Sequence, residues 1–222
     1  MNELNFIDWG QIDYSKALEL QTKMFNEKVL KKLNLEKDIP QDFIVCEHSN
    51  VYTIGKHGKD KNLLIDEKFL NKIGAEVFHI NRGGDITYHG QGQITGYPII
   101  DLDALNLGVR EYIFLIEQMI IDVMGEYGIV CERLKGATGV WLDSHSSKAR
   151  KICAIGVKVS RGITMHGYAL NVNTDLNYFN YINPCGFVDK GVTSMQKELD
   201  RELDIQQVKR QLYEKFLELI NK

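Results

Sequence analysis

A pair of strand-like runs in the second half of the chain limits the fold more than any other feature. Lys151–Ser160 and Ile163–Asn173 are apolar runs punctuated by glycines, and Arg161-Gly162 lies between them. Two such runs separated by two turn residues predict a β-hairpin. Because an isolated hairpin is only marginally stable, the chain should build a larger sheet that contains antiparallel pairs.

The other predicted elements do not alternate regularly between strand and helix. The expected helices are Tyr14–Leu33, Asp66–Ile73, Val109–Tyr127 and Ile205–Ile220, with a helical turn at Leu176–Tyr181. The expected strands are Leu4–Trp9, Asp42–Glu47, Val51–Ile54, Ala75–Asn81, Ile86–His89, Ile94–Asp101 and Gly139–Leu142. A GQGQ turn should join the fifth and sixth of these, and Pro98 favours an edge or strand-end position. The pattern predicts an α+β fold with a mixed, largely antiparallel sheet flanked by helices.

Composition excludes several classes of protein. The 222 residues suit a single domain, and the net charge of −3 carries no global nucleic-acid signature. No apolar run approaches the roughly 18 residues of a membrane span, and the N-terminus lacks a signal peptide's basic start and apolar middle. We therefore expect a cytoplasmic monomer. The basic clusters at Lys56–Lys61 and Lys148–Lys151 are either solvated loops or docking sites.

The chain offers no pattern for a metal or a nucleotide. The four cysteines lack CxxC pairing, the histidines form no HxxxH pattern, and neither GxGxxG nor GxxxxGK[ST] occurs. We therefore expect no cofactor and no metal, and at most one or two cysteines that carry chemistry.

Cys185 is the strongest candidate nucleophile. Pro184 and Gly186 on either side predict a tight turn that could present the sulfur to a cavity. A free thiol is only about 3% thiolate at pH 7. One ammonium at about 4 Å contributes about 4 kcal/mol at an effective dielectric of about 20, which is enough to favour the thiolate. Lys151, which begins an otherwise apolar strand, could supply it. Alternatively, Cys185 is a buried turn residue and Lys151 a solvent-facing strand end.

A second dense segment, RGGDITYHGQGQ, runs from Arg82 to Gln93. Its glycines, with Gly96 just beyond, allow the backbone to approach a ligand closely. The alternative is a glycine-rich hairpin with a core tyrosine, in which His89 is a structural histidine. His166 likewise is either a residue of the site or a structural histidine.

Four motifs in fixed order complete the picture: RGGDITYHGQGQITGYPIIDL, KICAIGV, MHGYALNVNTDL and INPCG. Together they resemble the octanoyl-[acyl-carrier-protein]:protein N-octanoyltransferases of lipoate biosynthesis, also called lipoyl(octanoyl) transferases. The resemblance extends from about Glu47 to Met195. It implies a fold shared with biotin and lipoate protein ligases, with a core at about 1–195 and a C-terminal helix at about 203–221 in one catalytic domain.

The resemblance also implies an activity and a site. The activity is transfer of an octanoyl group from octanoyl-acyl carrier protein to a lysine of a lipoyl domain, in 2-oxoacid dehydrogenase complexes or the glycine cleavage H protein. Cys185 matches the acyl-thioester cysteine, and Lys151 matches the lysine that lowers its pKa. The matched substrate-binding residues are Arg82, Gly83, Gly84, Asp85, Ile86, Thr87, Tyr88, His89, Ala154, Ile155, Gly156, Gly167, Tyr168 and Ala169.

Two positions depart from the family pattern. Gln91 replaces the usual proline of HGPGQ, and Cys153 stands at a position that is usually small. On a regular strand Cys153 would share a face with Lys151, which makes it the weaker candidate nucleophile.

The residues suggest a two-step transfer through a cysteine thioester without ATP. Three alternatives stay open: an ATP-dependent lipoate ligase on the same fold, a non-catalytic module that binds an acyl group or a lipoyl domain, and a cysteine hydrolase that pairs Cys185 with His89 or His166.

Overall fold

The computed structural model describes residues 4–36, 38–183 and 190–221. The helices are α1 (Tyr14–Leu33), α2 (Glu67–Lys72), α3 (Val109–Glu126), α4 (Met195–Leu199) and α5 (Ile205–Ile220). The strands are β1 (Leu4–Gln11), β2 (Gln41–Glu47), β3 (Val51–Ile54), β4 (Glu76–His79), β5 (Ile86–His89), β6 (Gln93–Ile99), β7 (Glu132–Leu134), β8 (Ala137–Leu142), β9 (Arg150–Ser160), β10 (Ile163–Asn171) and β11 (Gly191–Val192). No helix within these ranges is both long and apolar enough to cross a membrane.

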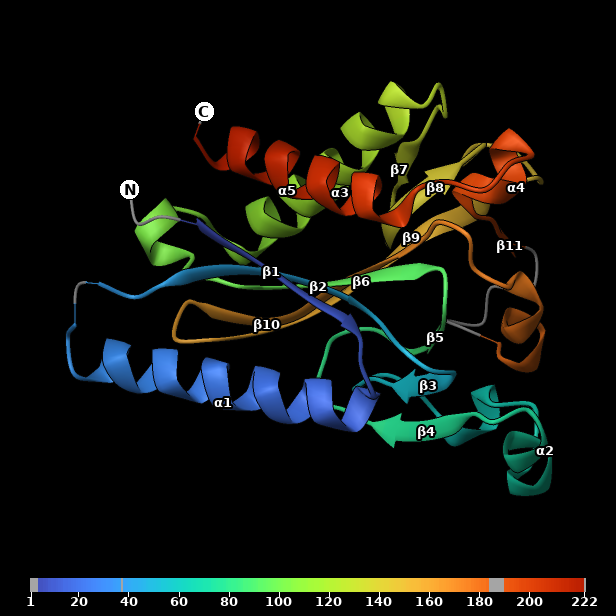
Figure 1. Cartoon of the computed structure of the whole chain (residues 1–222), viewed down its shortest axis with the longest axis horizontal. Coiled ribbons are helices and arrows are strands. Elements are labelled where there is room, and N and C mark those ends of the chain that lie inside the picture. The colour runs from blue at the N-terminus through green and yellow to red at the C-terminus, as the bar shows by residue number, and fades with distance from the viewer. Residues whose placement is uncertain (1–3, 37, 184–189, 222) are drawn as a thin grey trace.

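A large mixed sheet forms the centre of the fold (Figure 1). Its strands follow the order β1-β2-β6-β10-β9-β8-β7, and β11 pairs with β9. The β1–β2 and β9–β11 pairs are parallel, and the other pairs of this sheet are antiparallel. The prediction of a mixed, largely antiparallel sheet flanked by helices is therefore confirmed.

The predicted β-hairpin is present and is formed by β9 and β10. Ile163 on β10 pairs with Ser160 on β9, so the loop is the two residues Arg161 and Gly162. Both adopt positive φ, at 50° and 77°. Two-residue loops with positive φ at both positions match the right-handed twist of the strands that they join.

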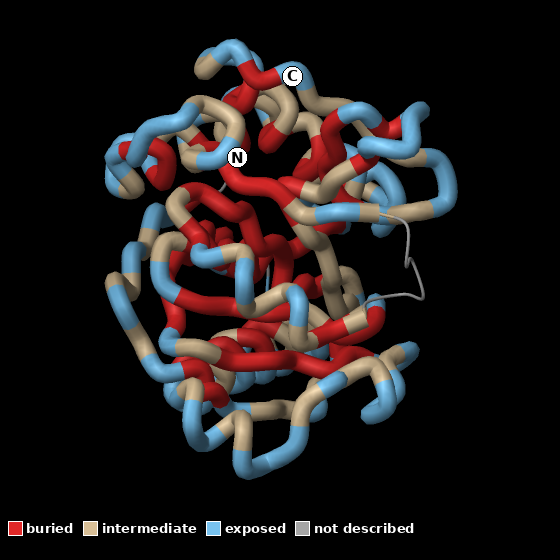
Figure 2. The backbone as a smooth tube through the Cα atoms, turned by 90° about the vertical axis from the view of Figure 1, so that its right-hand side faces the viewer, coloured by how far each residue is buried: buried red, intermediate tan, exposed pale blue. Residues whose placement is uncertain are grey.

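Helices cover both faces of the large sheet. In Figure 1, α1 lies under one face, and α3 and α5 lie over the other. Val208, Leu212 and Phe216 of α5 recur every four residues, so they share one side of the helix and enter the core. Asp204 begins that helix, since its carboxylate accepts hydrogen bonds from the backbone N–H groups of Gln206 and Gln207. Figure 2 shows the buried backbone running through the middle of the molecule, where both helical layers meet the sheet.

A small second sheet, in the order β4-β3-β5, packs beside the large one. Its core contains Tyr52 and Tyr88, with Tyr178 packed against it from the 3₁₀ turn Leu176–Tyr181. The ring of Tyr178 stacks on Tyr88 at 4.8 Å between centroids.

The two-sheet arrangement corrects the expected hairpin and decides between the two positions expected for Pro98, in favour of a strand end. First, β5 and β6 do not form a hairpin, because β5 belongs to the small sheet and β6 to the large one. The turn at Gly90–Gly92 therefore carries the chain from one sheet to the other. Second, β6 is an interior strand, between β2 and β10. Pro98 is tolerated there because it lies one residue from the end of β6, beyond the residues paired with β10.

Three short elements were not predicted, namely β7, α4 and β11. They have five residues or fewer, too few for a periodic pattern to show. β11 is nevertheless important for the site, because Val192 pairs with Lys151.

Candidate active site

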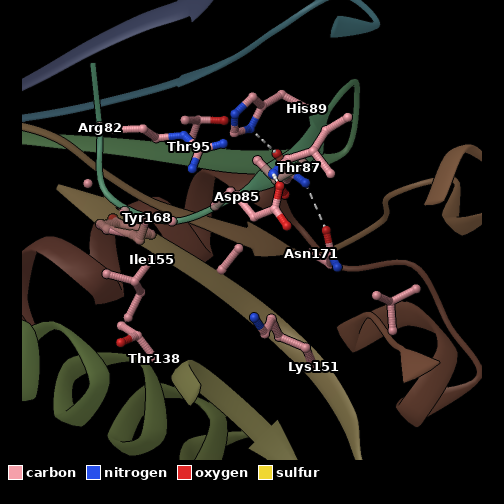
Figure 3. Close-up of a pocket in the computed structure, with 18 of the residues that line it drawn as sticks. Arg82, Asp85, Thr87, His89, Thr95, Thr138, Lys151, Ile155, Tyr168 and Asn171 are labelled. Atoms are coloured by element: carbon pink, nitrogen blue, oxygen red, sulfur yellow. Dashed lines mark hydrogen bonds between the residues drawn. The ribbon is translucent and has the colours of Figure 1, made fainter. Parts of the chain in front are cut away.

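A cavity of about 430 Å³ lies among residues of both sheets (Figure 3). The loop before β5, together with β5 itself, forms one wall, and β9 and β10 form another. Tyr14 of α1, Phe179 and the segment Lys190–Val192 complete the lining. Segments far apart in the sequence thus meet around one cavity.

The loop that begins at Arg82 is fixed between β3 and β9. Arg82 is buried, and its guanidinium donates to the backbone O of Thr53 at 2.8 Å and to Thr53 Oγ1 at 2.9 Å. The backbone N–H of Gly83 donates to the carbonyl of Val157 at 2.9 Å. A Cβ on Gly156 would lie 2.7 Å from Gly83 O, so glycine is required where β9 meets the loop.

Asp85 fixes the far end of the same loop. Its carboxylate accepts from the side-chain amide of Asn62 at 2.8 and 3.0 Å, and from the backbone N–H of Ile86 at 2.7 Å. The loop from Arg82 to Asp85 is thereby held at both ends, and Arg82, Gly84 and Asp85 line the cavity.

Lys151 reaches from β9 into the cavity (Figure 3). Its Nζ lies 4.6 Å from the centroid of the Trp141 ring, a distance at which a cation is attracted to the ring face. β9 is irregular here, because Val140 pairs with Cys153 while Trp141 pairs with Lys151. This bulge interrupts the alternation of side chains.

Cys185 lies outside the described residues, but the chain on both sides of it borders the cavity. Before the gap, the N–H of Asn183 donates to the carbonyl of Asn62, the residue that binds Asp85. After the gap, Lys190 and Val192 line the cavity, and Val192 pairs with Lys151.

Comparison with known proteins identifies the family. The profile of the lipoyl protein ligase A/B catalytic domain matches residues 13–217. The chain belongs to this family.

Members of the lipoyl protein ligase A/B family with high sequence identity are named octanoyltransferases. One from Bacteroides fragilis (strain YCH46) is 54% identical over 205 residues, which cover 92% of each chain. One from Parabacteroides distasonis is 54% identical over 220 residues and 99% of each chain.

Solved structures of other proteins share the fold at much lower identity. The bipartite lipoate protein ligase of Thermoplasma acidophilum matches with a TM-score of 0.74 at 14% identity, over 100% of this chain and 85% of that one. A biotin protein ligase from Aquifex aeolicus matches with a TM-score of 0.57 at 11% identity, over 100% of this chain and 72% of that one. The expected biotin and lipoate ligase fold is confirmed.

The structure brings most of the predicted site residues of this family member together. Lys151 and all of the predicted substrate-binding residues except Gly83 and Tyr88 line the cavity. Gly83 instead contacts β9 through its backbone. Tyr88 points into the core of the small sheet, where its hydroxyl donates to Asn50 Oδ1 at 2.7 Å.

Cys153 is separated from the cavity that Lys151 lines. Its side chain lies in the core between the large sheet and α3, fully buried together with Ile152. Because of the bulge, the regular alternation on which the expected shared face with Lys151 relied does not hold. Burial raises the pKa of the Cys153 thiol well above its usual range, and burial raises that of Cys131 to about 12. These two thiols are therefore poor nucleophiles.

The two cavity histidines are poor partners for a cysteine hydrolase. His89 has hydrogen-bond partners at both ring nitrogens, Thr53 Oγ1 at 3.2 Å and Gln93 Oε1 at 2.9 Å. Burial lowers the pKa of His89 and of His166 to about 3. A general base should titrate near the working pH, so neither ring suits that role at neutral pH. No group of potential metal ligands was found among the described residues.

Several lining residues were not predicted. Tyr14, Gln93, Thr95, Thr138 and Asn171 line the cavity from four separate elements, α1, β6, β8 and β10. The hydroxyls of Thr95 and Tyr168 are buried and lack a hydrogen-bond partner among the described residues. Gln93 and Asn171 lie within the recognised motifs, but the hydrogen bond between them joins β6 to β10, and a pairing of distant residues leaves no local signal in the sequence.

Proposed function

We propose that this chain transfers an octanoyl group from octanoyl-acyl carrier protein to a lysine of a lipoyl-domain protein, through a thioester on Cys185. The observation that carries the proposal is a lysine, Lys151, that projects into the cavity of a chain 54% identical to named octanoyltransferases. The expected acceptors are lipoyl domains of 2-oxoacid dehydrogenase complexes and the glycine cleavage H protein. We expect the enzyme to act as a monomer.

In the first step the Cys185 thiolate attacks the carbonyl carbon of the donor thioester. A new C–S bond forms to Cys185, the donor C–S bond breaks, and the carrier thiol leaves with a proton from the Lys151 ammonium. In the second step the neutral amine of the acceptor lysine attacks the enzyme thioester. An amide forms, the Cys185 thiolate is released, and Lys151 takes up the amine proton. Because an amide is more stable than a thioester, the transfer needs no ATP.

The cavity walls suit an acyl chain next to a polar reacting group. Ala154, Ile155 and Ala169 present small or apolar side chains to the cavity, and each buried methylene contributes about 0.8 kcal/mol. The glycine-rich loop from Arg82 to Asp85 presents backbone near the same space. The candidates for stabilising the tetrahedral oxyanion are backbone N–H groups of this loop other than that of Gly83, which donates to the carbonyl of Val157.

Intact mass measurement after incubation with octanoyl-acyl carrier protein, without acceptor, tests the proposal. The wild-type protein and Cys153→Ser should each gain one octanoyl group, and Cys185→Ser should gain none. An adduct that is lost in Cys153→Ser would move the nucleophile to that residue. Transfer that requires ATP and releases AMP, with no adduct on the enzyme, would instead indicate a ligase.

A further inference from the structure

A chain of hydrogen bonds between buried residues crosses the cavity wall from Arg82 to β11. Arg82 donates to Thr53 Oγ1 at 2.9 Å, and Thr53 Oγ1 lies 3.2 Å from Nε2 of His89. His89 Nδ1 lies 2.9 Å from Oε1 of Gln93. Gln93 Nε2 donates to Oδ1 of Asn171 at 2.9 Å. Figure 3 shows the bonds from His89 toward Asn171 as dashed lines.

The chain ends on the strand that flanks Lys151. Asn171 Nδ2 donates to the carbonyl of Thr193 at 2.9 Å, directly after β11. The N–H of Thr193 donates to the carbonyl of Lys151 at 2.9 Å. β11 is therefore held at its end by two hydrogen bonds, one to the backbone of Lys151 and one to the side chain of Asn171.

The direction of every bond in the chain follows from the groups that can only accept. Gln93 Oε1 only accepts, so His89 donates to it from Nδ1. Nε2 of the neutral ring therefore accepts the hydroxyl hydrogen of Thr53, whose oxygen in turn accepts from Arg82. At the other end, the carbonyl of Thr193 only accepts. Gln93 Nε2 also donates to the carbonyl of Tyr88 at 3.0 Å, which excludes the flipped amide.

We propose that Gln93 and Asn171 are positioning residues that hold β11 against β9 at Lys151, through the hydrogen-bond chain that runs from Arg82 to Thr193. This inference rests on the proposed function, because it assigns to Gln93 and Asn171 the task of holding the backbone around Lys151 in the proposed active site. His89 serves in the same chain as a neutral link and not as an acid or base.

β11 needs these additional hydrogen bonds because it is short. β11 has two residues, and both pair with β9. So few backbone hydrogen bonds stabilise the strand only slightly. Asn171 and Thr193 are buried, so an unpaired polar atom there would be costly. The side-chain amide of Asn171 thus fixes a short strand whose residues line the cavity.

The test is Asn171→Asp, with Asn173→Asp as a matched control. The first substitution replaces the N–H donor to the Thr193 carbonyl by a carboxylate oxygen, at nearly constant side-chain size. Asn173 makes a comparable pair of bonds outside the cavity, accepting from Leu203 N at 3.0 Å and donating to Leu203 O at 2.9 Å. Hydrogen exchange reports on β11 without any need for activity. Exchange of the Thr193 amide should accelerate about tenfold to a hundredfold in Asn171→Asp and stay unchanged in Asn173→Asp.

Transfer kinetics provide the second measurement. In Asn171→Asp the kcat for octanoyl transfer should fall about tenfold or more, while KM for the donor stays within about threefold, because small misplacements in a site affect mainly the reacting geometry. Asn173→Asp should retain kcat. Gln93→Glu keeps the acceptor for His89 but loses both donors, so it should act in the same direction if Asn171→Asp fails to fold.

The outcomes separate the two proposals. Unchanged exchange at Thr193 in both cavity variants, or equal kcat losses in Asn171→Asp and Asn173→Asp, would overturn the positioning role even if the wild-type enzyme transfers octanoyl groups. If the wild-type protein transfers no octanoyl group but exchange of the Thr193 amide still accelerates in Asn171→Asp, the proposed function would be overturned. The structural role of the hydrogen-bond chain would then be established.

Discussion

Lys151 is the described residue on which the proposed chemistry most depends, because its side chain projects into the cavity beside β11. Lys151→Met keeps the length of the side chain and removes its charge. Loss of a nearby ammonium should raise the pKa of the Cys185 thiol toward the ordinary value of about 8.5. At pH 7 the alkylation rate of Cys185 by iodoacetamide should therefore fall about tenfold or more.

The pH dependence of alkylation, read by peptide mass, measures this effect. Cys185→Ser supplies the background, which should be small because burial raises the pKa values of Cys46, Cys131 and Cys153. An unchanged alkylation profile in Lys151→Met would mean that another group activates the thiol.

Three buried histidines make the stability of the protein depend on pH. Burial lowers the pKa of His48 to about 4 and those of His89 and His166 to about 3. Below about pH 6.5 the unfolded chain binds protons at these histidines and the folded protein does not, so stability falls as the pH drops. The slope approaches about 1.4 kcal/mol per pH unit for each histidine.

Urea unfolding at pH 7 and pH 5 tests the contribution of one histidine. His166 has a φ of 60°, a conformation that asparagine adopts readily, so His166→Asn should fold. The loss of stability between the two pH values should be about 2 kcal/mol smaller in this variant than in the wild type. His57→Asn, at an exposed position, is the control. Equal losses in all three proteins would contradict the assignment.

At the scale of elements, the contact between β9 and the Arg82 loop requires glycine. Gly156→Ala would place a methyl group 2.7 Å from the Gly83 carbonyl and 3.1 Å from the Arg82 side chain. We expect a loss of about 1–3 kcal/mol of stability and a higher KM for the acyl donor, because the loop must move away from β9. Thermal unfolding and donor titration measure the two effects.

Gly125→Ala is a suitable control for that substitution. Gly125 lies in α3, and a Cβ there would meet no atom within 4 Å. Alanine should stabilise the helix by about 0.5–1 kcal/mol and leave KM unchanged. A KM that does not change in Gly156→Ala would show that the loop contact has no part in binding the donor.

At the scale of the whole molecule, α5 braces the turn between the two sheets. Lys209 of α5 is fully buried, with its Nζ 3.1 Å from Asp8 Oδ1 and 3.6 Å from Glu47 Oε1. The other oxygen of Glu47 accepts from the backbone N–H of Gly92 at 3.0 Å, in the turn that leads from β5 to β6. The C-terminal helix therefore contributes to the support of the site.

Lys209→Met should cost about 3–5 kcal/mol, because it leaves two carboxylates partly buried without their cation. Lys215→Met on the same helix removes only the ion pair with Glu218, whose carboxylate is largely exposed, and should change stability by less than about 1 kcal/mol. Urea unfolding measures both. Similar losses in the two variants would mean that Lys209 contributes by packing alone.

The sequence alone determined the features whose information is local. The period of apolar residues predicted α1 and α5 with their observed bounds, and Arg161-Gly162 predicted the β9–β10 hairpin. Both signals depend on residues a few positions apart, so they can be recognised without knowledge of the fold. The motifs shared with a family likewise identified the loop from Arg82 and the β9 and β10 segments that meet at the cavity.

The features that depend on distant partners could be read only from the three-dimensional structure. It placed β5 and β6 in different sheets, moved Cys153 into the core through a bulge opposite β8, and joined Gln93 to Asn171. Each depends on which strand lies beside which, and such pairing is set by burial and backbone hydrogen bonding across the whole sheet. A local pattern of residues does not contain that information, because the same strand-like run can pair with any partner that covers its apolar face.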